Sequence, residues 1–233
     1  MSRRLQVIGP LANWTDAFIG DYAPKACPGA APAHLDNKSD AVRTSSWCLR
    51  TALQEIAAAN TGGGATAFAA GCQDPKCAAE DNATAVATAL ASDIVVLILG
   101  LVTTHGGPGD TNSEGHDRAT VGLPGRQAAL AEAVIAVGKP TVLVVVGGGA
   151  VSVDFAKGRP NLAIVAAGFG GEAGAHALAT VLFGAANPSG RLAATIYNES
   201  DFTASCGTAS CMNNMSMQAG SGRSYRYAST WVF

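Results

Sequence analysis

The sequence has few charged residues. Only 14% of its 233 residues are Asp, Glu, Lys or Arg, against about 25% in an average soluble domain. Because disorder requires low hydrophobicity and high charge, and 48% of this chain is hydrophobic, we expect a folded core. The net charge is −2 and no basic stripe is visible, so a nucleic acid is not an expected partner.

Long apolar runs and several catalytic motifs are also missing. The longest apolar run, Ile94–Leu99, is far shorter than the roughly 20 residues needed to cross a bilayer, and no apolar signal region follows the basic start of the chain. The glycine run 147–149 follows an apolar segment without the spacing of a dinucleotide or P-loop fingerprint. No G-x-S-x-G elbow is present. These absences argue against a membrane protein, a nucleotide-binding domain and a serine hydrolase.

The sequence does contain short, β-branched apolar runs that alternate with helix-like stretches. This alternation predicts an α/β fold, an αβα sandwich with a mostly parallel, doubly wound sheet. The runs 93–100 and 141–146 are apolar on both faces, as in central strands covered by helices. Further strands are expected at 5–10, 66–70, 162–166 and 192–197. Helices are expected at 81–91, where Val86 and Leu90 form the apolar face, at 124–137 with Pro124 in the first turn, at 172–183, and from a Ser45 or Ser46 cap through Ala57.

In such sheets the ligand site lies at the carboxyl ends of the strands. The loops after Leu99, Val146 and Ala166 are therefore the functional candidates. The first of them, Leu101–Leu123, is long for a connecting loop, which marks it for function.

Cysteine spacing and glycosylation sequons point to an oxidising compartment. Short spacing and an even count favour three disulfides, Cys72–Cys77, Cys206–Cys211 and Cys27–Cys48. Zinc is the alternative, but it usually needs C-x2-C spacing with histidines nearby. Five N-x-S/T sequons begin at Asn13, Asn37, Asn82, Asn198 and Asn214. Unless the sequons are coincidental, we expect a secreted or cell-wall glycoprotein.

One segment of the long loop concentrates reactive side chains. It reads Glu114-Gly115-His116-Asp117-Arg118. Carboxylates and a guanidinium suit sugar hydroxyls as acceptors and donors, and a glutamate can protonate a glycosidic oxygen. A simple solvated loop is the alternative.

Motifs along the chain resemble a known family when they are taken in order. They include VIGPLAN, AAGCQDPKC, DIVVLILGL, EGHDR, LPGRQ, KPTVLVVVGGG, VDFAK, AGFGGEAGAHALATVLFG, NPSGRLAATIY and GRSYRY. Together they resemble the αβα sandwich domain of family 3 glycoside hydrolases, and most of all that of plant-type β-xylosidases. The resemblance extends from about Arg4 to Tyr227.

This resemblance implies a retaining hydrolase of β-linked xylo- or gluco-saccharides. In the family, an N-terminal barrel domain carries the nucleophile, and the sandwich domain contributes an acid/base glutamate across the domain interface. The resemblance therefore implies Glu114 as the catalytic residue, with His116, Asp117 and Arg118 binding substrate, and no cofactor or metal. We expect the sandwich at 1–200 and an irregular C-terminal extension at 201–233. The chain is too short to contain a barrel of roughly 250 residues as well, so we expect this chain to be inactive alone.

Some positions depart from the family pattern. Many relatives read E-x-E-G-x-D-R in this loop, with the first glutamate as acid/base, whereas Asn112 stands there in this chain. Asp110 is a second candidate. The departure leaves open an alternative, a non-catalytic carbohydrate-binding or structural domain left by truncation. If the domain evolved against a barrel, we expect Leu101, Val102 and Phe169 to form an exposed apolar face; the alternative is that they are ordinary core or loop anchors.

Overall fold

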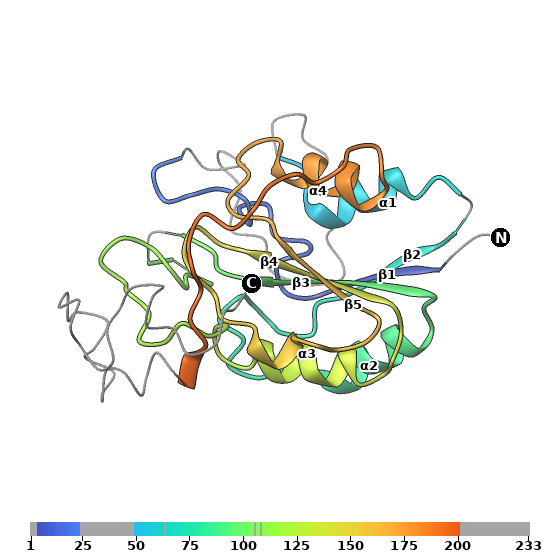
Figure 1. Ribbon diagram of the computed structural model, residues 1–233, viewed down its shortest axis with the longest axis horizontal. Helices are drawn as coiled ribbons and strands as arrows, with labels where there is room; N and C mark the ends of the chain where they lie inside the picture. The colour runs from blue at the N-terminus through green and yellow to red at the C-terminus, as the bar shows by residue number, and fades with distance from the viewer. Residues whose placement is uncertain (1–3, 24–48, 63, 105, 108, 201–233) are drawn as a thin grey trace.

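The computed structural model describes residues 4–23, 49–62, 64–104, 106–107 and 109–200. Its sheet has five parallel strands in the order β2-β1-β3-β4-β5 (Figure 1). Their bounds are β1 Leu5–Ile8, β2 Thr66–Ala69, β3 Ile94–Gly100, β4 Thr141–Val146 and β5 Leu162–Ala166. The expected α/β sandwich is confirmed, and β3 takes the central position that its doubly apolar sequence predicted.

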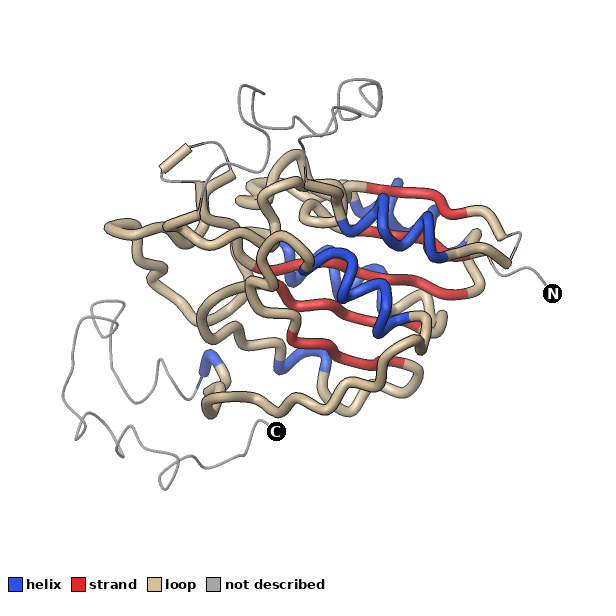
Figure 2. Tube along the Cα trace, turned by 90° about the horizontal axis from the view of Figure 1, so that it is seen from above, coloured by secondary structure: helices blue, strands red, loops and turns tan. Residues whose placement is uncertain are grey.

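Helices cover both faces of the sheet (Figures 1 and 2). α1 (Ala52–Ala59) and α4 (Gly174–Leu182) pack together on one face, and α2 (Asn82–Leu90) and α3 (Gln127–Ile135) pack together on the other. A short 3-10 helix, η2 (Asp154–Ala156), lies between β4 and β5. Because every strand runs in the same direction, the carboxyl ends of all five meet at one edge of the sheet.

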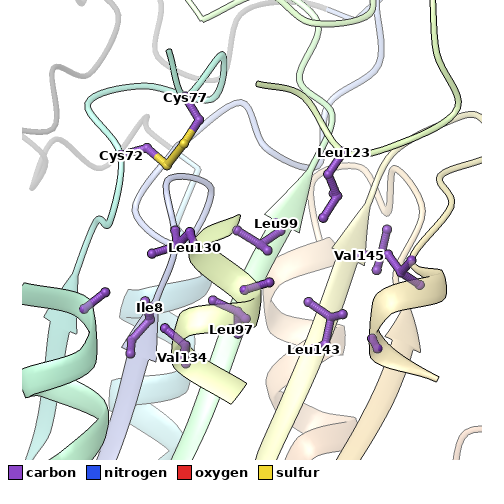
Figure 3. Packing of buried hydrophobic residues seen from close by; sticks show 14 of the residues in the cluster. Ile8, Cys72, Cys77, Leu97, Leu99, Leu123, Leu130, Val134, Leu143 and Val145 are labelled. Carbon is purple, nitrogen blue, oxygen red and sulfur yellow. A yellow bond between two sulfur atoms is a disulfide. The ribbon is translucent and has the colours of Figure 1, made fainter. Parts of the chain in front are cut away.

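The core consists of two apolar layers, one on each face. Strand side chains alternate between the faces, so Leu97 and Leu99 of β3 pack with α3 residues such as Leu130 (Figure 3). Val96 and Ile98 point to the opposite layer, under α1 and α4. Burial of each of these aliphatic side chains contributes about 1.5–3 kcal/mol to the free energy of unfolding. The two layers therefore fix the strand ends that carry the loops.

The first helix begins later than the sequence suggested. Its N-cap is Thr51, whose Oγ1 accepts the Gln54 backbone N–H at 3.3 Å, while Gln54 Oε1 accepts the Thr51 N–H at 3.0 Å. This Thr-x-x-Gln capping box fixes the start of the helix, so a helix starting at a Ser45 or Ser46 cap is wrong. Those two serines lie outside the described residues.

Two other helix predictions need correction. In α2 the buried face is Ala85 and Ala89, while Leu90 is 59% exposed, because the small alanines let the helix approach the sheet. α3 begins at Gln127, after a turn in which the Gln127 N–H donates to the Pro124 carbonyl at 3.1 Å. Pro124 therefore precedes the helix and does not form its first turn.

The expected strand at 192–197 is wrong. That segment has no regular structure, and Leu192 is 39% exposed. In the described part of the chain, β5 and β2 are the edge strands of the sheet, and no described strand pairs with the segment. Its apolar pattern lacks the neighbour that a strand needs for its backbone hydrogen bonds. The expected extension 201–233 lies outside the described residues.

Candidate functional site

The loops after β1, β3, β4 and β5 gather at the carboxyl edge of the sheet, away from the N-terminus (Figure 1). The loop of residues 101–123 follows β3 and is called the site loop below. It follows Gly100, the last residue of β3, whose φ of +132° and close approach to Val146 exclude a side chain; an added Cβ would lie 1.9 Å from the Val146 carbonyl oxygen. The strand end therefore turns sharply into the loop.

The expected exposed apolar face is not there. Leu101 and Val102 are fully buried and belong to the two core layers. Phe169 is half-buried, and its ring is the nearest neighbour of a Cβ built at Gly20 (3.7 Å) or Gly148 (2.8 Å). These side chains anchor the loops that follow β1, β3, β4 and β5. The interface prediction is wrong for Leu101 and Val102.

Asp110 organises the site loop from within. Its carboxylate accepts backbone N–H groups of Gly106 (2.7 Å), Thr104 (3.3 Å) and Asn112 (3.4 Å), and also the Ser113 hydroxyl. Burial raises the pKa of Asp110, but these hydrogen bonds outweigh it and the net pKa is lowered. A buried carboxylate that stays ionised and saturated with donors does not suit a general acid, so Asp110 serves the loop's conformation.

Glu114 lies at the exposed tip of this organised segment. Its backbone N–H donates to Asp21 Oδ2, in the loop after β1, and its carboxylate lies close enough to the hydroxyl of Tyr22 to raise the pKa of that phenol. The Glu114 carboxylate is the main reason the pKa of Tyr22 is raised, with desolvation and the negative charge of Asp21 adding to it. Tyr22 itself is 83% exposed. The fold thus joins a carboxylate, a phenol and a second acid at the surface.

His116 and Asp117 follow Glu114 at the surface. The His116 ring Nδ1 lies 3.2 Å from the Glu114 carbonyl oxygen, which requires that nitrogen to be the donor. Asp117 is exposed and makes no hydrogen bond or ion pair with the described residues. Both side chains are accessible to a polar ligand.

Arg118 points back into the protein. Its guanidinium donates to the Gly122 carbonyl at 2.9 Å and to the Ala150 carbonyl, in the loop after β4, at 2.7 Å. Desolvation lowers the pKa of Arg118, and the charge of Glu199 opposes this. Arg118 ties the site loop to its neighbour, so only part of its donor set faces outward.

Sequence reasoning missed Asp21 and Tyr22, and saw Asp110 only as a second acid/base candidate. Asp21 and Tyr22 lie in the loop after β1, which was not among the candidate loops. The signal was available, since β1 is a parallel strand and its carboxyl end meets the same sheet edge as β3.

A disulfide closes the loop after β2. Cys72 and Cys77 are bonded, with Cα atoms 5.1 Å apart, as the sequence predicted. Next to it, Arg126 forms a two-point ion pair with Glu80 at 2.8 and 2.9 Å, and the pKa of Glu80 falls to about 2. The other two expected bridges lie outside the described residues. Among the described residues no cluster of His, Cys, Asp and Glu is arranged for a metal, and none of the helices there is long and apolar enough to span a bilayer.

Comparisons with known proteins agree on one family. The family model described as "Glycosyl hydrolase family 3 C-terminal domain" matches residues 1–228. A probable β-D-xylosidase of Arabidopsis thaliana is 35% identical over 95% of this chain, and a β-xylosidase/α-L-arabinofuranosidase of Medicago sativa subsp. varia is 36% identical over 85% of it. The chain spans 24% and 22% of the lengths of these two relatives.

Solved structures share the fold. A family 3 exo-β-xylosidase in complex with a xylobiose aziridine probe superposes with a TM-score of 0.71 at 24% identity, covering 99% of this chain and 26% of its own. A family 3 β-glucosidase of Bifidobacterium adolescentis superposes with a TM-score of 0.58 at 30% identity, covering 87% of this chain and 26% of its own.

Proposed function

This chain belongs to glycosyl hydrolase family 3 as its C-terminal domain, and from that premise we propose that it is the sandwich domain of a retaining β-glycosidase. The named relatives favour β-xylosides as substrates, with β-glucosides next. In this proposal the nucleophile comes from an N-terminal barrel domain of the parent protein. The sandwich domain contributes Glu114 as acid/base and binds sugar hydroxyls.

The observation that carries the proposal is the placement of Glu114. It is an exposed residue at the carboxyl edge of a parallel sheet; its backbone N–H donates to Asp21, and its carboxylate lies near the phenol of Tyr22 and raises the pKa of that group. A general acid must reach the leaving oxygen and exchange its proton with water between steps. An exposed carboxyl next to a phenol supports that role, whereas the buried, ionised Asp110 does not.

The neighbouring residues take binding roles in the proposal. Asp117 and His116 are exposed on the same segment and offer an acceptor and an ionisable ring to sugar hydroxyls. Arg118 fixes the segment against the loop after β4 and contributes its remaining donors.

A complementation experiment tests the proposal. The chain alone is expected to leave aryl β-xylosides intact, because the retaining mechanism needs a second carboxyl about 5–5.5 Å from the first. Adding the separately produced barrel of a plant β-xylosidase should restore turnover. Glu114→Gln should then lower kcat on xylobiose by about 10²–10⁴-fold, with a smaller loss on a dinitrophenyl xyloside, whose leaving group needs no proton.

The control is Glu132→Gln. Glu132 is an exposed residue of α3, outside the site loop, so this variant should complement like the parent. Complementation that survives Glu114→Gln unchanged contradicts the acid/base assignment. Turnover by the chain alone contradicts the need for a second domain.

An alternative function is a sugar-binding domain without catalysis, which the replacement of the family's first glutamate by Asn112 favours. Titrating the chain with xylobiose and following backbone amide shifts separates the two proposals. Binding at the site loop without complementation supports the alternative.

We also propose that the chain is a secreted or cell-wall glycoprotein, supported by the disulfide and the sequons. Among the described sequons, the Asn13 side chain accepts the Thr51 hydroxyl at 3.2 Å and so faces the protein. Peptide mapping of chain made in a eukaryotic secretory host tests this; unmodified sequons and free Cys72 and Cys77 thiols would count against it.

A further inference from the structure

The buried amide of Gln127 connects two loops that are far apart in the sequence. Gln127 is fully buried at the start of α3. Its Oε1 accepts the Gly100 N–H at 2.8 Å, and its Nε2 donates to the carbonyls of Pro75 at 2.7 Å and Gly100 at 3.1 Å. A backbone group that is buried without a hydrogen-bond partner destabilises the fold, so all three bonds favour one position of the two segments. The side chain therefore ties the end of β3 to the loop after β2.

The loop after β2 is itself closed covalently. The disulfide makes residues 72–77 a small ring, called the brace loop here, whose two cysteines are 5% and 0% exposed. A short closed ring has few conformations available to it. The Pro75 carbonyl is thus presented to Gln127 from a fixed position.

The brace loop also contacts the middle of the site loop and the segment that follows it. In the middle, Gly109 lies so close to Pro75 and Trp14 that an added Cβ would fall 2.9 Å from the proline ring and 3.0 Å from the indole. Just beyond the far end, the Arg126 N–H donates to the Cys77 carbonyl at 2.8 Å. Gly109 immediately precedes Asp110 in the sequence. The four hydrogen bonds of Asp110 hold the loop on both sides of it, including Ser113, the residue before Glu114.

We propose that Gln127 is a positioning residue for the loop that carries Glu114, and that the disulfide-closed brace loop is the fixed support against which it acts. Gln127 holds the first residue before the site loop, Pro75 supports the middle, and Cys77 holds the segment just after it. The inference deepens the proposed function, because the loop it positions is the one assigned to the acid/base.

Backbone hydrogen exchange tests the inference without requiring turnover. Gln127→Met keeps the length of the side chain but removes all three hydrogen bonds. The amides of Gly106, Thr111 and His116, which are hydrogen-bonded within the site loop, should lose at least tenfold in protection. Amides of β4 exchange only through global unfolding and therefore report the overall stability of the variant, whereas the site-loop amides should exchange through local opening and be less protected than β4 in the parent chain.

Two further variants complete the design. Glu132→Met, on the exposed side of the same helix, is the control and should leave all amides unchanged. Cys72→Ala/Cys77→Ala opens the brace loop and should lower protection at the same site-loop amides; it decides alone if Gln127→Met does not fold.

Unchanged site-loop protection in either folded variant would overturn the inference. So would site-loop amides that are as strongly protected as β4 in the parent chain, because their loss in the variant would then report only the lower stability of the whole fold. Failure of complementation by the parent chain would refute the proposed function and leave this exchange result standing.

Discussion

Replacing Asp110 with Ala is the most direct way to release the site loop. The change removes the acceptor of three backbone N–H groups and the Ser113 hydroxyl at once. A hydrogen bond to a charged group is worth about 1.5–3 kcal/mol, but Thr104 is half-buried and Gly106 is exposed, so water replaces part of the loss. We expect a net loss of about 2–3 kcal/mol in the free energy of unfolding.

The pH dependence of this effect has a definite sign. The folded-state pKa of Asp110 is lowered, so its contribution is fully present above the unfolded value of about 3.9 and is lost as the pH falls through the lower folded value. The difference between the parent chain and Asp110→Ala should therefore be constant from about pH 5 to 7 and shrink below about pH 4.

The assay is urea denaturation at several pH values, with Asp110→Asn as the matched variant. The amide keeps one acceptor oxygen but presents an NH2 group to donors, so it should lie between the parent and Asp110→Ala. A variant within about 0.5 kcal/mol of the parent, or a difference that grows as the pH falls, would refute the role given to Asp110.

Three further predictions concern the scaffold. Thr51→Ala should lower the free energy of unfolding by about 1 kcal/mol through loss of the capping box, and Thr51→Ser should restore most of it in thermal melts. Phe169→Ser should destabilise by about 2–3 kcal/mol, less than for a fully buried ring, without changing the sedimentation coefficient; a more monomeric, equally stable variant would revive the interface idea. Arg126→Met should raise the pKa of Glu80 from about 2 toward its ordinary value in an NMR titration, and an unmoved pKa would contradict the ion pair.

The central strands could be predicted because their sequences allow little else. The segments 141–146 and 162–166 coincide with β4 and β5 residue for residue. A run that is apolar on both faces can only be satisfied between two helical layers, so local sequence and tertiary context agree there. The expected segment at 192–197 has a similar pattern, but strand formation also depends on a neighbour, which local sequence does not report.

The buried faces and first residues of helices were harder to predict, because they depend on alanines and on a single cap residue. In α2 the bulkier Val86 and Leu90 looked like the buried stripe, yet Ala85 and Ala89 face the core. The methyl group of alanine is too small to mark a buried face in the sequence, and the helix turns toward the sheet the face that allows the closest approach. The Thr51 capping box was visible in the sequence as Thr-x-x-Gln, and only the competing serines hid it.

The candidate site shows the same division between local and long-range information. The segment 114–118 was found from its composition, but composition does not say which side chains turn outward. The fold directs Arg118 toward the carbonyls of Gly122 and Ala150, and it sets Glu114 beside Asp21, 93 residues away in the sequence. Only the parallel sheet, which brings the ends of β1 and β3 to one edge, creates that pair. Glu114 is therefore the acid/base candidate on grounds the motif could not supply: it is an exposed carboxylate of the site loop, and it lies near a phenol whose pKa it raises, at the edge where ligands of such sheets bind.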